Sequence, residues 1–226
     1  MDQRLDRVLA RLHSLASPEA VAGMARFGIR PENILGISMP TLRSLAREVG
    51  KDHQLALGLW ESGIHEARIL ASMVDVPGLV TEEQMESWVK DFDSWDVCDQ
   101  VCGNLFDRTP FAYRKAVEWS ERSEEFVKRA GFVMMAGLVL HDKRAGDEQF
   151  EVFFPCILQE STDDRNFVKK AVNWALRGIG KRSRRLNQRA IETARQIAGI
   201  DSKTARWIAS DALRELTSEK IQSKWA

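Results

Sequence analysis

The sequence is poor in the residues that mark several classes of protein. It has three cysteines, six prolines and one tyrosine among 226 residues, and no net charge, because 33 basic side chains balance 33 acidic ones. The odd cysteine count argues against a disulfide framework and favours a reducing compartment. The longest nearly apolar run, Ala130 to Leu140, has 11 residues, whereas a membrane-spanning helix needs about 20. We therefore expect a cytoplasmic protein that does not associate with membranes.

Metal ligands and cofactor motifs are also scarce. The four histidines, His13, His53, His65 and His141, are scattered without the spacing of metal ligands. Gly178-Ile-Gly180 does not follow a strand pattern, so it does not predict a phosphate-binding loop. We expect neither a metal nor a cofactor.

Charge is distributed unevenly along the chain. Nine basic residues and no acidic residue occur between Arg165 and Ile191, whereas twelve acidic and five basic residues occur between Thr81 and Glu125. Zero net charge argues against a protein that coats nucleic acid along its whole surface. A local basic zone can nevertheless bind a polyanion.

Apolar residues recur at intervals of three and four, which is typical of amphipathic helices. One such series is Leu5, Val8, Leu9, Leu12 and Leu15. No segment shows the sustained alternation of a strand, and no linker rich in Pro, Gly or Ser divides the chain. The sequence therefore predicts an all-α protein with one domain, residues 1–226.

Helix start signals support this reading. Ser17-Pro18 and Thr109-Pro110 each place a hydroxyl before a proline, as at the first residue of a helix. Thr81 and Gln84 have the spacing of a capping box. These signals predict helices that begin directly after Ser17, Thr81 and Thr109.

An internal repeat narrows the fold class. Phe126-Val-Lys-Arg-Ala130 recurs 41 residues later as Phe167-Val-Lys-Lys-Ala171, with weaker echoes at His65 to Ile69 and Ser202 to Arg206. Units of about 40 residues, each a pair of helices, are typical of HEAT-like repeats. We expect a HEAT-like solenoid of stacked antiparallel helix pairs with a concave groove.

The expected helix 167–181 carries a basic stripe. Lys170, Trp174, Arg177 and Lys181 follow one another at steps of four, three and four, so they share a face separate from the apolar one. The basic zone continues at Arg182, Arg184 and Arg185. Cations beside an indole favour nucleic acid, since the cations bind phosphates and the indole packs on a sugar or base. A solvated helix face whose Trp covers a neighbouring helix is the alternative.

A second motif combines a carboxylate with an indole. In Trp95-Asp-Val-Cys-Asp99 the first and last residues are four apart, so a helix places them side by side. A carboxylate shielded by an indole suits chemistry that builds positive charge on a sugar, such as cleavage of a glycosidic bond. An ordinary amphipathic helix with a half-buried Trp would show the same spacing.

Four motifs in this order resemble the DNA alkylation repair glycosylases of the AlkD type. They are Met24 to Phe27 followed by Leu35 to Pro40; Trp95 to Asp99; Lys128 to Ala130; and Lys169 to Ala171 with Trp174 and Arg177. The resemblance extends over most of the chain.

The resemblance implies an enzyme that releases purines carrying a positive charge from alkylation at N3 or N7 of duplex DNA, in base excision repair. It implies that Asp99 is the catalytic carboxylate, that Trp95 and Trp174 flank it, and that Arg129, with Lys128 beside it, binds phosphate near the lesion. It requires no cofactor. We expect a monofunctional hydrolase that leaves an abasic site, acts as a monomer and needs no protein partner.

Two other functions remain open for the same scaffold. One is a non-catalytic HEAT-like binder of bent or branched DNA, and the other is a solenoid that binds a protein. The presence of Asp99, both tryptophans and Arg129 favours the enzyme, and the basic zone argues against the protein-binding alternative.

Overall fold

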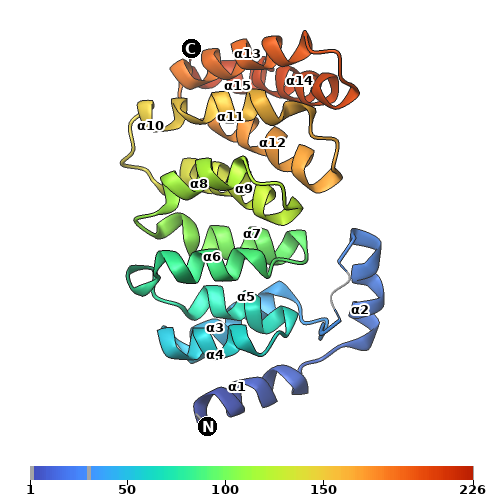
Figure 1. Ribbon diagram of the computed structural model, residues 1–226, viewed down its shortest axis with the longest axis vertical. Helices are drawn as coiled ribbons and strands as arrows, with labels where there is room; N and C mark the ends of the chain where they lie inside the picture. The colour runs from blue at the N-terminus through green and yellow to red at the C-terminus, as the bar shows by residue number, and fades with distance from the viewer. Residues whose placement is uncertain (1–2, 30–31, 226) are drawn as a thin grey trace. The chain divides into compact units, whose positions relative to one another are not determined.

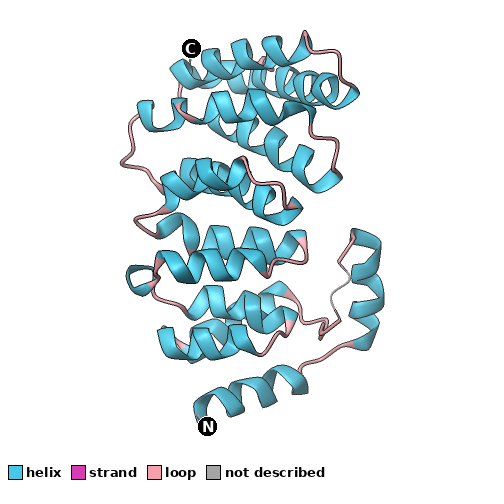
Figure 2. Ribbon diagram, viewed as in Figure 1, coloured by secondary structure: helices cyan, strands magenta, loops and turns pink. Residues whose placement is uncertain are grey.

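The computed structural model describes residues 3–29 and 32–225. Within these ranges all regular secondary structure is helical, and the segments between helices are short loops (Figure 2). The predicted all-α class is therefore confirmed. No helix in the described ranges has both the length and the apolar character that a bilayer span requires.

The chain forms two compact units, Met1–Pro110 and Phe111–Ala226. Each is a set of helices that pack on their neighbours in chain order (Figure 1). The expectation that residues 1–226 form a single domain stays a prediction.

The first unit contains seven α-helices and three short 3₁₀-helices among its described residues. They are α1 (Gln3–Ser14), α2 (Pro18–Met24), η1 (Ala25–Phe27), α3 (Met39–Val49), α4 (His53–Glu61), α5 (His65–Val74), η2 (Pro77–Leu79), α6 (Glu82–Lys90), α7 (Trp95–Asn104) and η3 (Phe106–Arg108). Helix α5 packs against α3, α4 and α7. The indoles of Trp60 and Trp88 stack with ring centroids 4.0 Å apart. Burial of these apolar faces stabilises the unit.

The second unit continues the same pattern. Its helices are α8 (Ala112–Ser120), α9 (Glu125–His141), α10 (Glu148–Glu151), α11 (Phe153–Gln159), η4 (Glu160–Thr162), α12 (Asn166–Ile179), α13 (Arg184–Ala198), α14 (Lys203–Leu216), α15 (Glu219–Gln222) and η5 (Ser223–Trp225). Helix α9 packs against both α8 and α12, and α14 packs against both α12 and α13. The long apolar run of α9 is almost entirely buried, which explains why it is apolar on every face.

Two of the three predicted helix starts are confirmed. The Ser17 hydroxyl accepts a hydrogen bond from the Ala20 amide at 3.4 Å, and the Thr81 hydroxyl accepts one from Gln84 at 3.1 Å. The predicted start after Thr109 is wrong, because α8 begins at Ala112. The Thr109 hydroxyl instead donates a hydrogen bond to the Phe106 carbonyl at 2.8 Å, so it ends the preceding 3₁₀ turn.

The repeated five-residue segment marks equivalent positions on two packed helices. Its copies lie at the starts of α9 and α12, and the rings of Phe126 and Phe167 contact each other with centroids 5.5 Å apart. The Arg129 guanidinium donates a hydrogen bond to the Phe167 carbonyl at 2.6 Å. The repeat is therefore a structural one, in which each copy contacts the next.

The close approach of α8 and α9 requires a glycine. A Cβ added at Gly131 would lie 2.4 Å from the Ser120 amide nitrogen and 2.9 Å from the Ala116 carbonyl oxygen, both backbone atoms of α8. Backbone atoms cannot rotate away as a side chain can, so a side chain at this position would push the two helices apart.

We expect Gly131→Ala to lower the free energy of unfolding by about 1–3 kcal/mol, as overpacking typically does. The matched control is Gly103→Ala in α7, where an added Cβ meets nothing within 4 Å, and where Ala is intrinsically better than Gly by up to about 1 kcal/mol. Chemical denaturation of both variants measures the difference. Equal stability of the two variants would contradict the close packing of α8 on α9.

Candidate functional site

Helix α7 presents Trp95 and Asp99 on a partly exposed face. Trp95 is the first residue of the helix, and both side chains are half-buried, whereas Val97 and Val101 are fully buried. The four-residue spacing thus separates the two candidate residues from the core face, as the sequence predicts. Their catalytic role stays a prediction.

The orientation of the Trp95 ring is fixed by a segment distant in sequence. Its indole N–H donates a hydrogen bond of 2.9 Å to the backbone carbonyl of Phe27 in η1. The Phe27 side chain itself is 68% exposed. The part of the chain around η1 therefore reaches α7 and holds one of the two candidate residues in place.

A buried carboxylate holds residues 35–37, which lie shortly before α3. Glu66 is 1% exposed, and its two oxygens accept hydrogen bonds from the amides of Leu35 at 2.8 Å, Gly36 at 2.6 Å and Ile37 at 3.2 Å. Gly36 has a φ of +76°, and a Cβ there would lie 2.4 Å from the Ser17 carbonyl oxygen. Three amide donors compensate the charge of Glu66 for its loss of water.

A histidine of α5 holds the first turn of α7. The His65 Nε2 atom lies 2.9 Å from Asp96 Oδ2, and the His65 side chain is fully buried. Burial lowers the pKa of His65, but the hydrogen bond and charge of Asp96, with the charges of Glu66 and Asp93, outweigh it and raise the pKa above 6.5. Burial likewise opposes the effect of His65 on Asp96, whose pKa is nevertheless lowered from 3.8. The two side chains therefore favour an ion pair.

The cysteines of α7 lie on its buried side. Cys98 and Cys102 are both fully buried. Burial raises the pKa of the Cys102 thiol well above its ordinary value, and the contact with Cys98 and the charges of Asp99 and Asp107 raise it further. Cys102 stays a neutral thiol, which makes it unsuitable as a nucleophile.

In the second unit, Lys128 and Arg129 are buried at the start of α9, at 8% and 6% exposure. The Lys128 ammonium forms an ion pair with Glu160 and lies 3.5 Å from Asp163 Oδ2. Arg129 is bound to the Phe167 carbonyl. Contact of either cation with DNA stays a prediction, and it would require these groups to leave or share their present partners.

The basic stripe of α12 is partly neutralised by α14. Arg177 lies 2.8 Å from Glu215 Oε2 and 3.4 Å from Asp211, and the Lys181 ammonium lies 2.9 Å from Glu215 Oε1. These ion pairs also lower the pKa of Glu215, although its burial opposes the shift. Arg177 of α12 and Lys181 of the turn after it, both predicted DNA-binding cations, thus bind α14.

Trp174 and Lys170 are the members of the stripe that remain available to a ligand. Trp174 is half-buried on α12, and Lys170 is exposed with no side-chain partner among the described residues. The helix ends at Ile179, two residues before the predicted end, so Lys181 lies in the following turn. The sequence spacing predicts a shared helix face for Lys170, Trp174 and Arg177, all of which lie in α12, but it does not show which cations have acidic partners.

The cations that follow α12 also differ in whether their side chains have partners within the chain. Arg182 donates hydrogen bonds to the carbonyls of Val139 at 2.8 Å and Ala145 at 2.7 Å. Arg185 forms exposed ion pairs with acids of α10. Arg184 is exposed and has no side-chain partner in the described part of the chain.

The site residues that the sequence reading missed are those that act through backbone groups or buried pairs. Phe27 contributes a carbonyl, which no side-chain motif reveals. The sequence predicts that His65 is a structural residue near the start of a helix, and α5 does begin there, but the sequence does not reveal the partners of His65 and Glu66, which lie about 30 residues away. Among the described residues no group of three or more His, Cys, Asp or Glu side chains could hold a metal ion.

The His65–Asp96 pair makes stability depend on pH. Because the pKa of His65 is raised, its stabilising contribution is complete below about pH 6.5 and is lost as the pH rises through the folded-state value. Because the pKa of Asp96 is lowered, its contribution is complete above about pH 4 and is lost at lower pH. The pair therefore stabilises the fold most between these two limits.

We expect the free energy of unfolding of the wild type to fall relative to that of His65→Gln between about pH 6 and pH 9, with a slope of at most about 1.4 kcal/mol per pH unit. Denaturant titrations at several pH values measure this difference. The matched control is His13→Gln, which removes an exposed imidazole of α1. Parallel pH profiles for wild type and His65→Gln would contradict the ion pair.

Comparison with solved structures shows the fold. A protein from a family related to the HEAT-like repeat DNA glycosylases, with affinity for branched DNA structures, superposes with a TM-score of 0.75 at 18% identity, over 93% of this chain and 94% of that chain. The chain therefore has a HEAT-like repeat fold. A designed armadillo repeat protein matches with a TM-score of 0.37 at 13% identity, over 79% of this chain and 92% of that one.

Comparison with curated proteins gives no match. The model of one protein family, described as DNA alkylation repair enzyme, matches residues 8–216, which include every candidate residue on α7, α9 and α12. Because this family model matches nearly the whole chain, the protein belongs to the DNA alkylation repair enzyme family.

Proposed function

We propose that the protein is a DNA N-glycosylase that releases positively charged, N3- or N7-alkylated purines from duplex DNA and leaves an abasic site. The observation that carries the proposal is the placement of Trp95 and Asp99 together on the partly exposed face of α7, in a member of this family. A carboxylate next to an anchored indole has an evident use in glycosidic chemistry.

The chemistry requires an anion and a water molecule. An alkylated purine with a positive charge is already an activated leaving group, so no general acid has to protonate it. As the bond from C1′ to the purine nitrogen breaks, its electron pair goes to the base, which leaves neutral, and positive charge develops on the sugar. The Asp99 carboxylate stabilises that charge and orients the water that adds to C1′. The proton of the water passes to the carboxylate and then to solvent.

Groups close to Asp99 in the first unit restrict where the glycosidic bond can be broken. Trp95 is held by Phe27 and provides a rigid apolar surface beside the carboxylate. The His65–Asp96 ion pair fixes the first turn of α7, where Trp95 begins the helix. Trp174 is the second indole that the proposal assigns to the sugar and backbone of the damaged nucleotide. Such CH–π and stacking contacts position the substrate but do not carry charge.

Of the predicted DNA-binding cations, Lys170 and Arg184 are exposed and have no side-chain partner among the described residues, so DNA binding is assigned to them first. Arg129, Lys128, Arg177, Lys181, Arg182 and Arg185 stay secondary candidates, because each is bonded within the chain. The proposal includes a monomeric, cytoplasmic protein with no cofactor and no obligate protein partner.

Binding of branched DNA without excision is the second candidate. The structure that superposes on this chain belongs to a family with affinity for branched DNA, and that observation favours the same ligand here. The two functions differ in one measurable property, since only a glycosylase releases a free base.

We expect wild-type protein to release 7-methylguanine and 3-methyladenine from methylated duplex DNA, and Asp99→Asn to do so at least about a hundredfold more slowly, as is typical for loss of a preorganised electrostatic group. Chromatography of the released bases under single-turnover conditions measures both rates. Asp93→Asn is the matched control, because Asp93 is an exposed carboxylate six residues earlier. Equal rates for wild type and Asp99→Asn would remove Asp99 from the mechanism.

Lys170→Glu tests the contact with DNA. We expect it to weaken duplex binding about tenfold and to reduce the slope of log affinity against log salt by about one. Lys170 is a cleaner test than Arg177, whose replacement would also break its ion pairs with Asp211 and Glu215 of α14. Lys220→Glu, on the exposed face of α15, is the control for charge reversal. Unchanged affinity and salt slope in Lys170→Glu would place the phosphate contacts elsewhere.

A further inference from the structure

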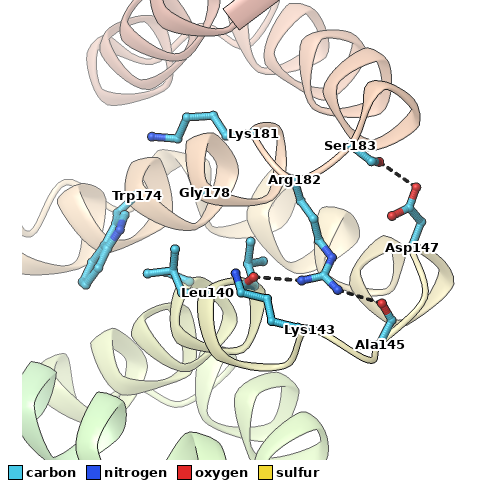
Figure 3. Close-up of a pocket in the computed structure, with 11 residues that line it drawn as sticks. Leu140, Lys143, Ala145, Asp147, Trp174, Gly178, Lys181, Arg182 and Ser183 are labelled. Atoms are coloured by element: carbon cyan, nitrogen blue, oxygen red, sulfur yellow. Dashed lines mark hydrogen bonds between the residues drawn. The ribbon is translucent and has the colours of Figure 1, made fainter. Parts of the chain in front are cut away.

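The second unit contains a pocket of about 480 Å³, most of whose lining residues, apart from Trp174, Lys181 and Arg182, have no part in the proposed function. It lies between the end of α9, the loop 142–147, the second half of α12 and the turn 181–183. Figure 3 shows Trp174, Lys143 and Lys181 among the residues around it. All of its lining belongs to the unit Phe111–Ala226.

The walls of the pocket are fixed by hydrogen bonds. Arg182 joins the end of α9 to the loop, because its guanidinium bonds both the Val139 and the Ala145 carbonyl, as the dashed lines in Figure 3 show. The same guanidinium lies over the ring of Phe150 at 4.3 Å from its centroid. The Ser183 hydroxyl donates to Asp147 at 2.6 Å. The pocket is thus formed before any ligand arrives, which reduces the entropic cost of binding.

A turn in the loop presents Lys143. Asp142 Oδ1 accepts hydrogen bonds from the amides of Arg144 at 3.1 Å and Ala145 at 3.0 Å, and its Oδ2 atom accepts one from the Tyr113 hydroxyl at 3.0 Å. The carboxylate next to Lys143 is therefore engaged with other groups. Lys143 itself is exposed, and its ammonium has no partner among the described residues.

The lining combines an aromatic surface with an excess of positive charge. Trp174 and Leu140, which is 52% exposed, contribute apolar surface. Lys143, Lys181 and Arg182 contribute three cations, against one carboxylate from Asp147, which already accepts the Ser183 hydroxyl. Lys181 shares its charge with Glu215 and Arg182 is bonded to two carbonyls, whereas the Lys143 ammonium has no partner among the described residues. An indole with cations at the edge of one cavity is a feature with which proteins bind single-stranded nucleic acid, through base stacking and phosphate contacts.

We infer that this pocket binds one unpaired nucleotide of single-stranded DNA. The base stacks on Trp174 and Leu140, and its phosphate contacts the ammonium groups of Lys143 and Lys181. The volume lies in the range of small-molecule sites, about 300–1,000 Å³, so it accommodates a nucleotide. The inference rests on the proposed function in taking DNA as the ligand and in sharing Trp174 with it, and it involves no bond cleavage.

The test uses the full chain and a fluorescein-labelled oligothymidine of about ten nucleotides, which is within the usual site size for a single-stranded binding groove. Fluorescence anisotropy gives the affinity. We expect Lys143→Ala to weaken binding about tenfold, as loss of a hydrogen bond to a charged group does. Lys220→Ala is the matched control and should bind as the wild type does.

A second variant blocks the cavity without changing charge. Gly178 lines the pocket, and a Cβ there lies 3.9 Å from Ala136, so a side chain can start without a clash. We expect Gly178→Leu to extend into the pocket and weaken oligothymidine binding at least about fivefold, because one stacked base contributes about 1–3 kcal/mol. Thermal unfolding verifies that both variants are folded.

Competition experiments distinguish a nucleotide from inorganic phosphate as the ligand of the pocket. Thymidine monophosphate should displace the oligonucleotide at a lower concentration than inorganic phosphate does, since only the nucleotide can stack. Equal competition by the two would overturn the nucleotide assignment in favour of a phosphate site. Wild-type affinity in both Lys143→Ala and Gly178→Leu would overturn the pocket itself. The oligothymidine carries no alkylated base, so failure of base excision would not affect either result.

Discussion

Basic side chains that bond to the next helix pair hold the second unit together. Lys128 reaches Glu160 and Asp163, Arg129 reaches the Phe167 carbonyl, and Arg177 reaches Asp211 and Glu215. Each bond joins elements about 30–40 residues apart, which is one repeat. Because most of these groups are partly buried, their charges are less screened than surface pairs are. These cations therefore serve the stacking of repeats, and contact with a polyanion would compete with that role.

This use of charge limits how the protein can recognise DNA. Zero net charge argues against a surface that coats a polyanion along its whole length, so the proposed DNA contacts depend on local groups. In the proposal these groups are the carboxylate beside an anchored indole on α7 and, in the second unit, Trp174 with Lys143. In the first unit, two adjacent residues of α5 hold other segments in place. His65 binds α7, and Glu66 binds the amides of residues 35–37.

Much of this arrangement could be predicted from the sequence, and the exceptions have physical reasons. The helical period, the 41-residue repeat and the shared face of Trp95 and Asp99 depend on local spacing, which one sequence records. The start of α8 was mistaken because Thr109 bonds backward to Phe106, a choice that the Thr-Pro pair does not reveal. The partners of Arg177, Lys181 and Arg182 depend on which helices stack, and Phe27 acts through a backbone carbonyl. Lys143 lies outside the basic zone, so only the fold shows that it shares a pocket with Trp174.

The central claim is that this fold breaks a glycosidic bond at a cationic base. The most direct measurement uses an end-labelled duplex with a single 7-methylguanine at a known position, incubated with the wild-type protein and then treated with alkali or with buffer alone. The account predicts strand cleavage at that position after alkali only, which identifies an abasic site formed by a monofunctional enzyme. An intact strand after alkali, under conditions where the protein is bound to the duplex, would contradict it.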